Sequence, residues 1–119
     1  MATILLAEDE DSVGAFVARA LTQNGHQVTR VANGLAALGA LAAAPFDLLL
    51  TDIVMPELDG ITLALKASKD YPAMKILLMT GYAAERQRAH NLDALVHRVV
   101  MKPFTLKDIQ KAVAESLGG

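Results

Sequence analysis

Several features are missing from this sequence, and each absence excludes a class of protein. No cysteine is present, which excludes disulfides, thiol catalysis and cysteine-ligated zinc. No apolar run approaches the roughly 18 residues of a membrane-spanning helix. The N-terminal apolar run is too short for a signal peptide, and no basic residues precede it. We therefore expect a cytoplasmic protein with no membrane partner.

Lysine and arginine form no run, and the formal net charge is −2. These features predict no direct binding of nucleic acid. The histidines at positions 26, 90 and 97 lie too far apart for the usual spacing of metal ligands. No internal repeat or linker interrupts the 119 residues, a length that suits one compact domain. We expect a single domain over residues 1–119, with no output domain.

What the sequence does contain is an alternation of five short apolar runs with helix-like segments. Two of the runs are nearly continuous in Leu, Ile or Met, as a sheet covered on both faces requires. The second run is interrupted by Gln27, Thr29 and Arg30, which predicts an edge position. The alternation predicts an α/β fold with a parallel sheet and right-handed crossovers. The predicted strands are Thr3–Ala7, Gln27–Val31, Asp47–Thr51, Lys75–Met79 and Leu95–Val100.

The helix-like segments carry apolar residues at helical spacing. Asp11 or Ser12 is the predicted N-cap of the first helix, and Thr105 that of the last. Gly60 is expected to supply backbone freedom before the third helix. The first helix should bury a stripe formed by Val13, Phe16, Val17, Ala20 and Leu21. The second should turn inward Leu35, Leu38 and Leu41.

Carboxylates gather where two of the predicted strands end. The cluster Glu8-Asp9-Glu10-Asp11 follows the first strand, and Asp52 follows the apolar run of the third. In open α/β sheets ligands bind at this carboxyl edge. If the two strands are neighbours, three carboxylates share one pocket, and a compensating cation is needed to keep them ionised. Such a pocket predicts a hard divalent cation, most simply Mg²⁺.

Four motifs stand in order along the chain. They are Glu8-Asp9, the stretch from Asp52 through Met55-Pro56 to Asp59-Gly60, Thr80-Gly81, and Lys102-Pro103-Phe104. With them the whole chain resembles the receiver domains of two-component response regulators. The resemblance implies a flavodoxin-like, doubly wound (βα)5 fold with strand order 2-1-3-4-5. The stretches 4–9 and 91–97 further resemble the stand-alone cell-cycle regulators of the CpdR type found in alphaproteobacteria.

The resemblance also implies a role for each motif residue. Asp52 is the expected nucleophile, which becomes an acyl phosphate. Thr80 and Lys102 are expected to contact the phosphoryl oxygens, with the Lys102–Pro103 bond cis so that the ammonium points inward. The side chains of Val54 and Tyr82 would flank the phosphate. The implied Mg²⁺ ligands are Glu8, Asp9, Asp52 and the carbonyl of Val54.

These roles describe a phosphorylation switch rather than an enzyme that acts on other substrates. A histidine kinase or phosphotransfer protein would donate the phosphoryl group. The output would be a protein–protein contact, for instance with a protease adaptor or regulator, through the fourth helix, fifth strand and fifth helix. The fourth helix, predicted over Ala83–Asn91, offers only alanines as apolar groups, so we expect it to be weakly anchored and to shift on activation.

Two departures from the family pattern keep alternatives open. Glu8 stands where most members carry Asp, and Val99 stands where an aromatic residue usually couples to the phosphorylated site. A receiver-like interaction module that takes no phosphate is therefore one alternative. An aspartate-nucleophile phosphatase is another, although Asp52-Ile53-Val54 lacks the second Asp of that motif. A flavodoxin-type carrier is the third, although the acidic cluster would repel a phosphate unless a cation were present.

Overall fold

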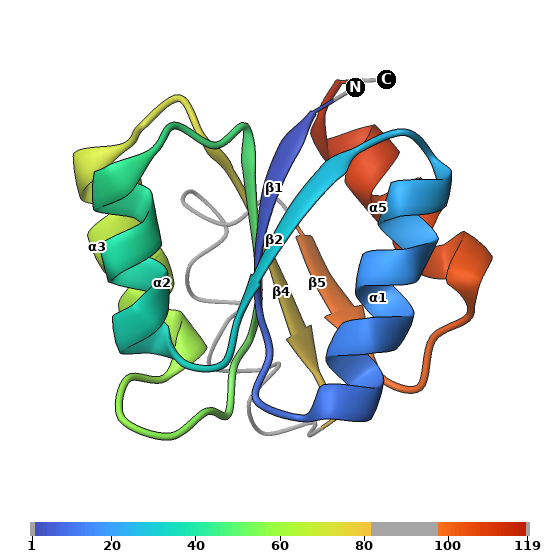
Figure 1. Cartoon of the computed structure of the whole chain (residues 1–119), viewed down its shortest axis with the longest axis horizontal. Coiled ribbons are helices and arrows are strands. Elements are labelled where there is room, and N and C mark those ends of the chain that lie inside the picture. Colours follow the sequence, from blue (N-terminus) through green and yellow to red (C-terminus); the bar gives the residue numbers. More distant parts are fainter. Residues whose placement is uncertain (1, 82–97, 119) are drawn as a thin grey trace.

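The computed structural model describes residues 2–81 and 98–118, which form a parallel sheet flanked by helices. The five strands stand in the order β2-β1-β3-β4-β5, as predicted. They are β1 (Thr3–Ala7), β2 (Gln27–Val31), β3 (Leu48–Asp52), β4 (Lys75–Thr80) and β5 (Arg98–Met101). The helices in the described ranges are α1 (Asp11–Gln23), α2 (Gly34–Ala43), α3 (Gly60–Asp70) and α5 (Leu106–Ser116). Figure 1 shows α1 and α5 on one face of the sheet and α2 and α3 on the other.

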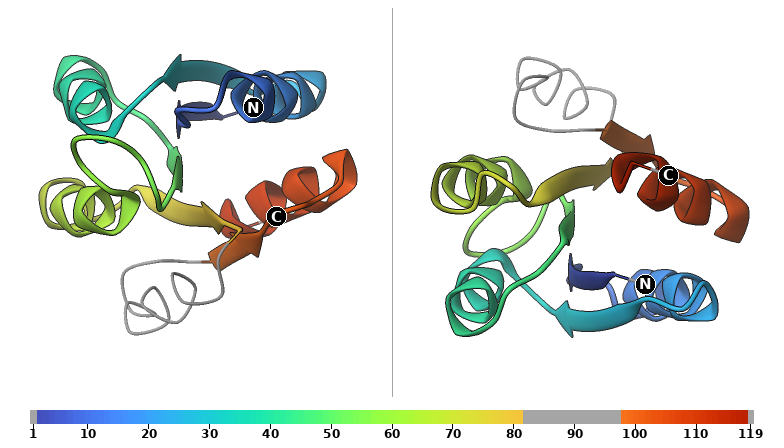
Figure 2. Two further views of the ribbon diagram at one scale, coloured as in Figure 1. Left: turned by 90° about the horizontal axis from the view of Figure 1, so that it is seen from below. Right: turned by 90° about the horizontal axis from the view of Figure 1, so that it is seen from above.

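Figure 2 shows helices on both sides of the sheet, and a hydrophobic core lies on each side. Side chains alternate along each strand, so Leu49 packs with the α2 and α3 residues while Leu48 and Leu50 pack with those of α1 and α5. All five residues of β3 are buried, which explains its nearly continuous apolar sequence. The three carboxyl ends of β1, β3 and β4 are thereby fixed side by side at one edge.

The strand predictions are confirmed, with small shifts in their bounds. β1 and β2 have the predicted ends, and β2 occupies an edge. β3 begins and ends one residue later than predicted, so that Asp52 is its last residue. The start of the fifth predicted strand, residues 95–97, and the predicted fourth helix lie outside the described residues. Within the described ranges, no helix is long and apolar enough to cross a membrane.

Three local predictions are wrong. Neither Asp11 nor Ser12 caps α1: the helix begins at Asp11, its N-cap is Glu10, and no side-chain cap bond forms. Leu35 does not face inward but is 53% exposed, because Ala37 and Leu41 are the α2 residues that face the sheet. The prediction chose the wrong face because α2 has no charged residue to mark its exposed side. Phe16 is 36% exposed rather than buried in the α1 stripe. Thr105, by contrast, is the N-cap of α5 as predicted, with a full capping box.

Gly60 is required for a different reason from the one predicted. It starts α3, and its N–H donates to the carbonyl of Ile53 at 2.8 Å. A Cβ at this position would lie 2.0 Å from the backbone oxygen of Asp52. The glycine therefore lets the N-terminus of α3 pack directly on the carboxyl end of β3, rather than permitting an unusual φ. The position of Asp52 depends on this close approach.

Gly60→Ala should destabilise the protein by about 2 kcal/mol or more, because the new methyl group meets backbone that can move only with β3. Gly39→Ala is the matched control: Gly39 lies in α2 with nothing within 4 Å of an added Cβ. It should stabilise the protein by about 0.5–1 kcal/mol through helix propensity alone. Urea unfolding measures both. Equal effects of the two substitutions would contradict the packing argument.

Candidate functional site

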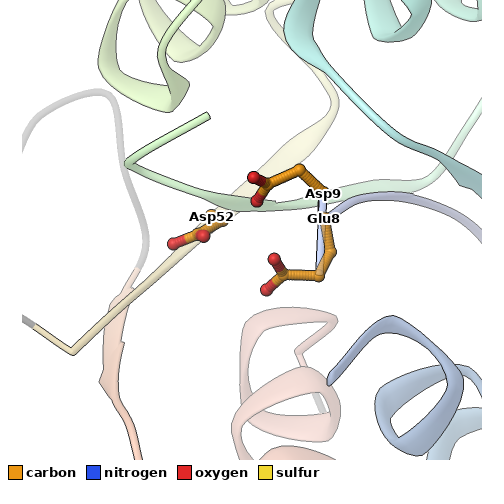
Figure 3. Close-up of side chains that lie close together, drawn as sticks. All are labelled: Glu8, Asp9 and Asp52. Carbon is orange, nitrogen blue, oxygen red and sulfur yellow. The ribbon is translucent and has the colours of Figure 1, made fainter. Parts of the chain in front are cut away.

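Three carboxylates meet at the carboxyl edge of the sheet. Asp52 ends β3, and Glu8 and Asp9 directly follow β1, which pairs with β3 so that Ala7 lies opposite Thr51. One carboxylate oxygen from each of Glu8, Asp9 and Asp52 lies within 4.8 Å of the others. Figure 3 shows the three side chains pointing toward a common space. The predicted meeting of these carboxylates is confirmed.

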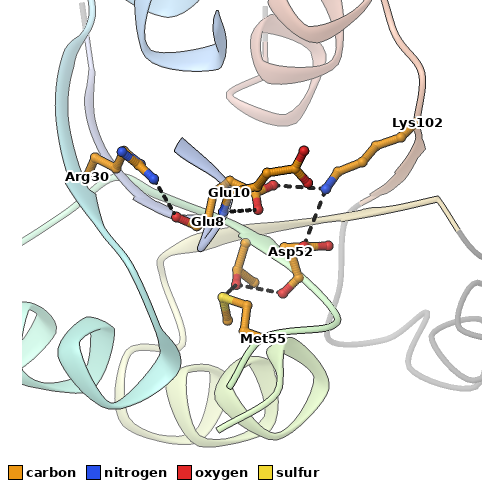
Figure 4. A network of polar contacts seen from close by, with 7 residues as sticks. Glu8, Glu10, Arg30, Asp52, Met55 and Lys102 are labelled. Atoms are coloured by element: carbon orange, nitrogen blue, oxygen red, sulfur yellow. Dashed lines mark hydrogen bonds and ion pairs between the residues drawn. The ribbon is translucent and has the colours of Figure 1, made fainter. Parts of the chain in front are cut away.

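Lys102 brings a positive charge into the same cluster. Its Nζ lies 2.9 Å from Oε1 of Glu8 and 3.3 Å from Oδ2 of Asp52 (Figure 4). The residue follows β5, and its backbone N–H donates to the carbonyl of Thr80 at 2.8 Å, which ties the β5–α5 loop to the end of β4. The Lys102–Pro103 bond is cis, as the resemblance implied. The ammonium thus bridges the acids from two different strand ends.

Glu8 is fully buried, so each of its oxygens needs a partner inside the protein. Oε1 accepts from Lys102, and Oε2 accepts from the backbone N–H of Glu10 at 3.1 Å. The backbone carbonyl of Glu8 accepts from Nη2 of Arg30 at 3.0 Å. Glu8 therefore contacts Lys102 from a buried position, whereas Asp9 is exposed and lines the cavity.

The positive charge of Lys102 does not fully compensate the carboxylates of Glu8 and Asp52. Burial raises the pKa of Glu8 above its usual value, although hydrogen bonds from Lys102 and Glu10 oppose the shift. Burial likewise raises the pKa of Asp52 against the charge of Lys102. For Lys102, burial acts to lower the pKa, but the hydrogen bond to Glu8 and the charge of Asp52 outweigh it, and the pKa is raised. One ammonium only partly compensates two buried carboxylates, so a further cation would favour their ionised forms.

A cavity of about 690 Å³ opens beside Asp52. Its lining includes the charged side chains of Asp9, Asp52 and Lys102 together with aromatic and aliphatic side chains. Phe16 of α1 and Phe104 of the β5–α5 loop stack there, with ring centroids 6.4 Å apart. Sequence analysis assigned Phe16 to the core and missed this pair. The position of Phe104 directly after Lys102-Pro103 could have indicated that its ring lies near the site.

The remaining predicted residues surround this cavity in different ways. Val54 is 48% exposed and lines it. Thr80 is fully buried at the end of β4, one residue beyond the Asp52–Met79 pair of the sheet register. Tyr82 lies outside the described residues. The structure thus brings together Glu8, Asp9, Asp52 and Lys102 and places Thr80 on the neighbouring strand end.

The donor set suits a hard divalent cation. Three carboxylates converge within 4.8 Å, and Mg²⁺ binds through one or two protein carboxylates plus waters and phosphate oxygens. Among the residues that the structure describes, this cluster contains no sulfur or imidazole ligand, the kinds that softer metals prefer. The residues present therefore fit Mg²⁺, with Glu8, Asp9 and Asp52 as the available ligands.

Lys102→Met should destabilise the protein by about 1–3 kcal/mol at neutral pH, less than for a fully buried pair because the Lys102 side chain is 21% exposed. Mg²⁺ should then raise the melting temperature of this variant more than that of wild type, since the metal replaces the lost cation. Thermal unfolding with and without Mg²⁺ measures both effects.

The exposed Lys111 of α5 provides the control. Lys111→Met should change stability by no more than about 0.5 kcal/mol and leave the response to Mg²⁺ unaltered. The same Mg²⁺-induced rise in wild type and Lys102→Met would contradict the view that lysine and metal compensate the same carboxylates.

Comparison with known proteins places these residues in a family context. Residues 4–114 match the family described as response regulator receiver domain. The response regulator receiver protein CpdR of Brucella abortus is 42% identical over 117 residues, 98% of each chain. The sensor kinase CckA of the same organism is 40% identical over 98% of this chain, which spans 12% of that kinase. The structure of the response regulator TrrA from Thermotoga maritima, in complex with Mg²⁺ and BeF, superposes with a TM-score of 0.88 at 26% identity and covers 97% of this chain and 98% of that one.

Proposed function

The chain belongs to the response regulator receiver family, and from this premise we propose that it is a phosphorylation switch whose phosphoacceptor is Asp52. The observation that carries the proposal is the convergence of Glu8, Asp9 and Lys102 on the carboxyl group of Asp52, at the mouth of the cavity. A family resemblance alone would not require that all four side chains meet. Their meeting supplies both the nucleophile and the charges that phosphoryl transfer needs.

The chemical step is a displacement at phosphorus. An Asp52 oxygen attacks the phosphoryl group of a phosphohistidine, the O–P bond forms, and the N–P bond breaks with its electron pair passing to the imidazole nitrogen. The product is an acyl phosphate on Asp52, which water later hydrolyses to phosphate and the free carboxylate. Burial that disfavours the charged Asp52 carboxylate in the resting protein also removes the water shell that a free carboxylate would have to shed before attack.

Lys102 is proposed to serve the unmodified and the phosphorylated protein from one position. In the resting protein its ammonium lies between Glu8 and Asp52. When Asp52 is phosphorylated, the phosphoryl oxygens become the stronger anions, and the ammonium can contact them from the same position. Thr80, at the end of the adjacent strand, is proposed to contribute its hydroxyl to the phosphoryl group.

Mg²⁺ is the proposed cofactor, held by Glu8, Asp9, Asp52 and the carbonyl of Val54. When bound, it neutralises the charge that gathers on the transferring phosphoryl oxygens. The carboxylates offer oxygen ligands to the metal. Because Lys102 offsets only part of their negative charge, a second cation would stabilise them.

The proposed donor is a histidine kinase or a phosphotransfer protein, and the proposed output is a protein–protein contact. The likeness to a segment of the sensor kinase CckA and to CpdR supports a two-component setting. We propose that the output surface comprises the segment around 83–91, which lies outside the described residues, with β5 and α5. Val99 of β5, which stands where the family usually carries an aromatic residue, packs against the α2/α3 core. We propose that a shift on phosphorylation runs instead through the segment around 83–91 and the loop after Thr80.

Incubation with acetyl phosphate and Mg²⁺ should add about 80 Da, one phosphoryl group, to the intact protein. Asp52→Asn should abolish the adduct because the amide cannot act as the nucleophile, and chelation of Mg²⁺ should strongly reduce it. Asp70→Asn, at the exposed end of α3, is the matched control and should be labelled like wild type. An adduct that persists in Asp52→Asn would overturn the assignment of the phosphoacceptor.

A further inference from the structure

One basic side chain outside the cluster contacts the loop that carries Glu8 and Asp9. Arg30 lies on the edge strand β2, opposite Leu6 of β1, and neighbours in parallel register share a face. Leu6 belongs to the core under α1 and α5, so Arg30 rises on the α1 side of the sheet. Its Nη2 donates to the backbone carbonyl of Glu8 at 3.0 Å (Figure 4) and to Oδ1 of Asp11 at 2.9 Å.

The carbonyl that Arg30 holds belongs to the peptide unit that joins Glu8 to Asp9. A peptide unit is planar, so fixing its oxygen fixes the plane between the two Cα atoms from which both carboxylates project. On the other side of the residue, the N–H of Glu8 donates to the carbonyl of Val31 at 3.1 Å. The edge strand β2 therefore holds Glu8 through both of its backbone groups.

Gly14 of α1 provides the space in which the guanidinium lies. A Cβ on Gly14 would lie 2.1 Å from Nε and 2.6 Å from Cζ of Arg30. Gly14 has no positive φ, so the close approach of Arg30, and not backbone conformation, explains the glycine. A larger residue at position 14 would therefore force the guanidinium of Arg30 to shift.

The ion pair with Asp11 does not account for this arrangement. The Asp11 side chain is 95% exposed, and exposed ion pairs contribute little to stability. Within the described residues, moreover, Nε of Arg30 is buried without a hydrogen-bond partner, which is unfavourable. The hydrogen bond to the carbonyl of Glu8 is therefore the contact that explains the position of the Arg30 guanidinium.

We propose that Arg30 is a positioning residue for Glu8 and Asp9 in divalent-cation binding, and that Gly14 is the slot that admits its side chain. The inference rests on the proposed function only in taking this cluster as the Mg²⁺ site. Residues that orient metal ligands typically change metal affinity by about 10- to 100-fold when they are replaced.

The sign of the effect separates positioning from charge. A nearby cation that acts only through its field repels Mg²⁺, so replacing it with a neutral residue should tighten metal binding. Loss of a positioning contact should weaken binding instead. The two explanations therefore predict opposite changes for the same substitution.

The experiment is calorimetric titration of Mg²⁺ into the full chain at neutral pH and physiological ionic strength. Arg30→Met should weaken binding about 10-fold or more, and Arg30→Lys should recover part of the loss because an ammonium can still donate to the carbonyl. Gly14→Ala should weaken binding like Arg30→Met. The double variant should be no weaker than either single one, since one contact is lost in all three.

Two controls isolate the contact to Glu8. Arg19→Met removes the same charge from an exposed position of α1 and should leave binding unchanged or slightly tighter. Asp11→Asn breaks the exposed ion pair but keeps the carbonyl contact, and should change affinity by less than about threefold at an ionic strength that screens exposed charges. Circular dichroism checks that each variant is folded.

Equal or tighter Mg²⁺ binding by folded Arg30→Met overturns the positioning role. Unchanged binding by folded Gly14→Ala overturns the slot. If Gly14→Ala does not fold, the Arg30→Met and Arg30→Lys pair still decides the positioning role. Absence of Mg²⁺ binding by wild type would instead contradict the proposed metal site itself.

Discussion

The structure depends on the burial of acidic side chains around the ammonium of Lys102. Glu8 and Asp52 are removed from water at the carboxyl edge of the sheet, and Lys102 bridges them at 2.9 and 3.3 Å. Two carboxylates against one ammonium leave a net negative charge, and Asp9 adds another at the rim. Buried charge of one sign is unfavourable unless a counter-charge can enter. The cluster could therefore hold a metal ion beside Asp52.

The surrounding fold serves to hold these side chains in place. Gly60 brings the start of α3 against the carbonyl of Asp52. The loop after β5 is tied to the end of β4 by the bond between Lys102 and Thr80. On the opposite side, β2 holds the backbone of Glu8 through Val31 and Arg30. Each of the four other strands thus contributes, directly or through its neighbour, to the surroundings of the last residue of β3.

Sequence analysis could predict the sheet because its signals are local. Continuous apolar runs identified the buried strands, and the polar residues of Gln27–Val31 identified an edge. The acidic cluster and Asp52 could be placed together because parallel strands end at one edge. The inward face of α2 could not be predicted, since Gly34–Ala43 contains no charged residue to mark its outer side.

Contacts that depend on distant residues were accessible only in the structure or through family resemblance. Lys102 and Glu8 are separated by 94 positions, and nothing local distinguishes Lys102 from a surface lysine. The sequence indicated only that Arg30 interrupts the apolar pattern of an edge strand. Its contacts with Glu8 and Gly14 join residues that are distant in sequence, so no local pattern reveals them. Gly60 was recognised as necessary, but the reason, its approach to the Asp52 carbonyl, is a tertiary one.

The cluster around Asp52 is proposed to require a second cation and to bind it at one place. Titration of isotope-labelled protein with Mg²⁺, followed by the backbone amide resonances, tests this most directly. Binding of one metal ion per chain should give saturable shifts, largest for residues 8–11 and 52–55, and should leave the resonances at the far ends of the strands unaffected. Shifts that never saturate, or that appear at exposed acids such as Glu115 but not at Asp52, would contradict it.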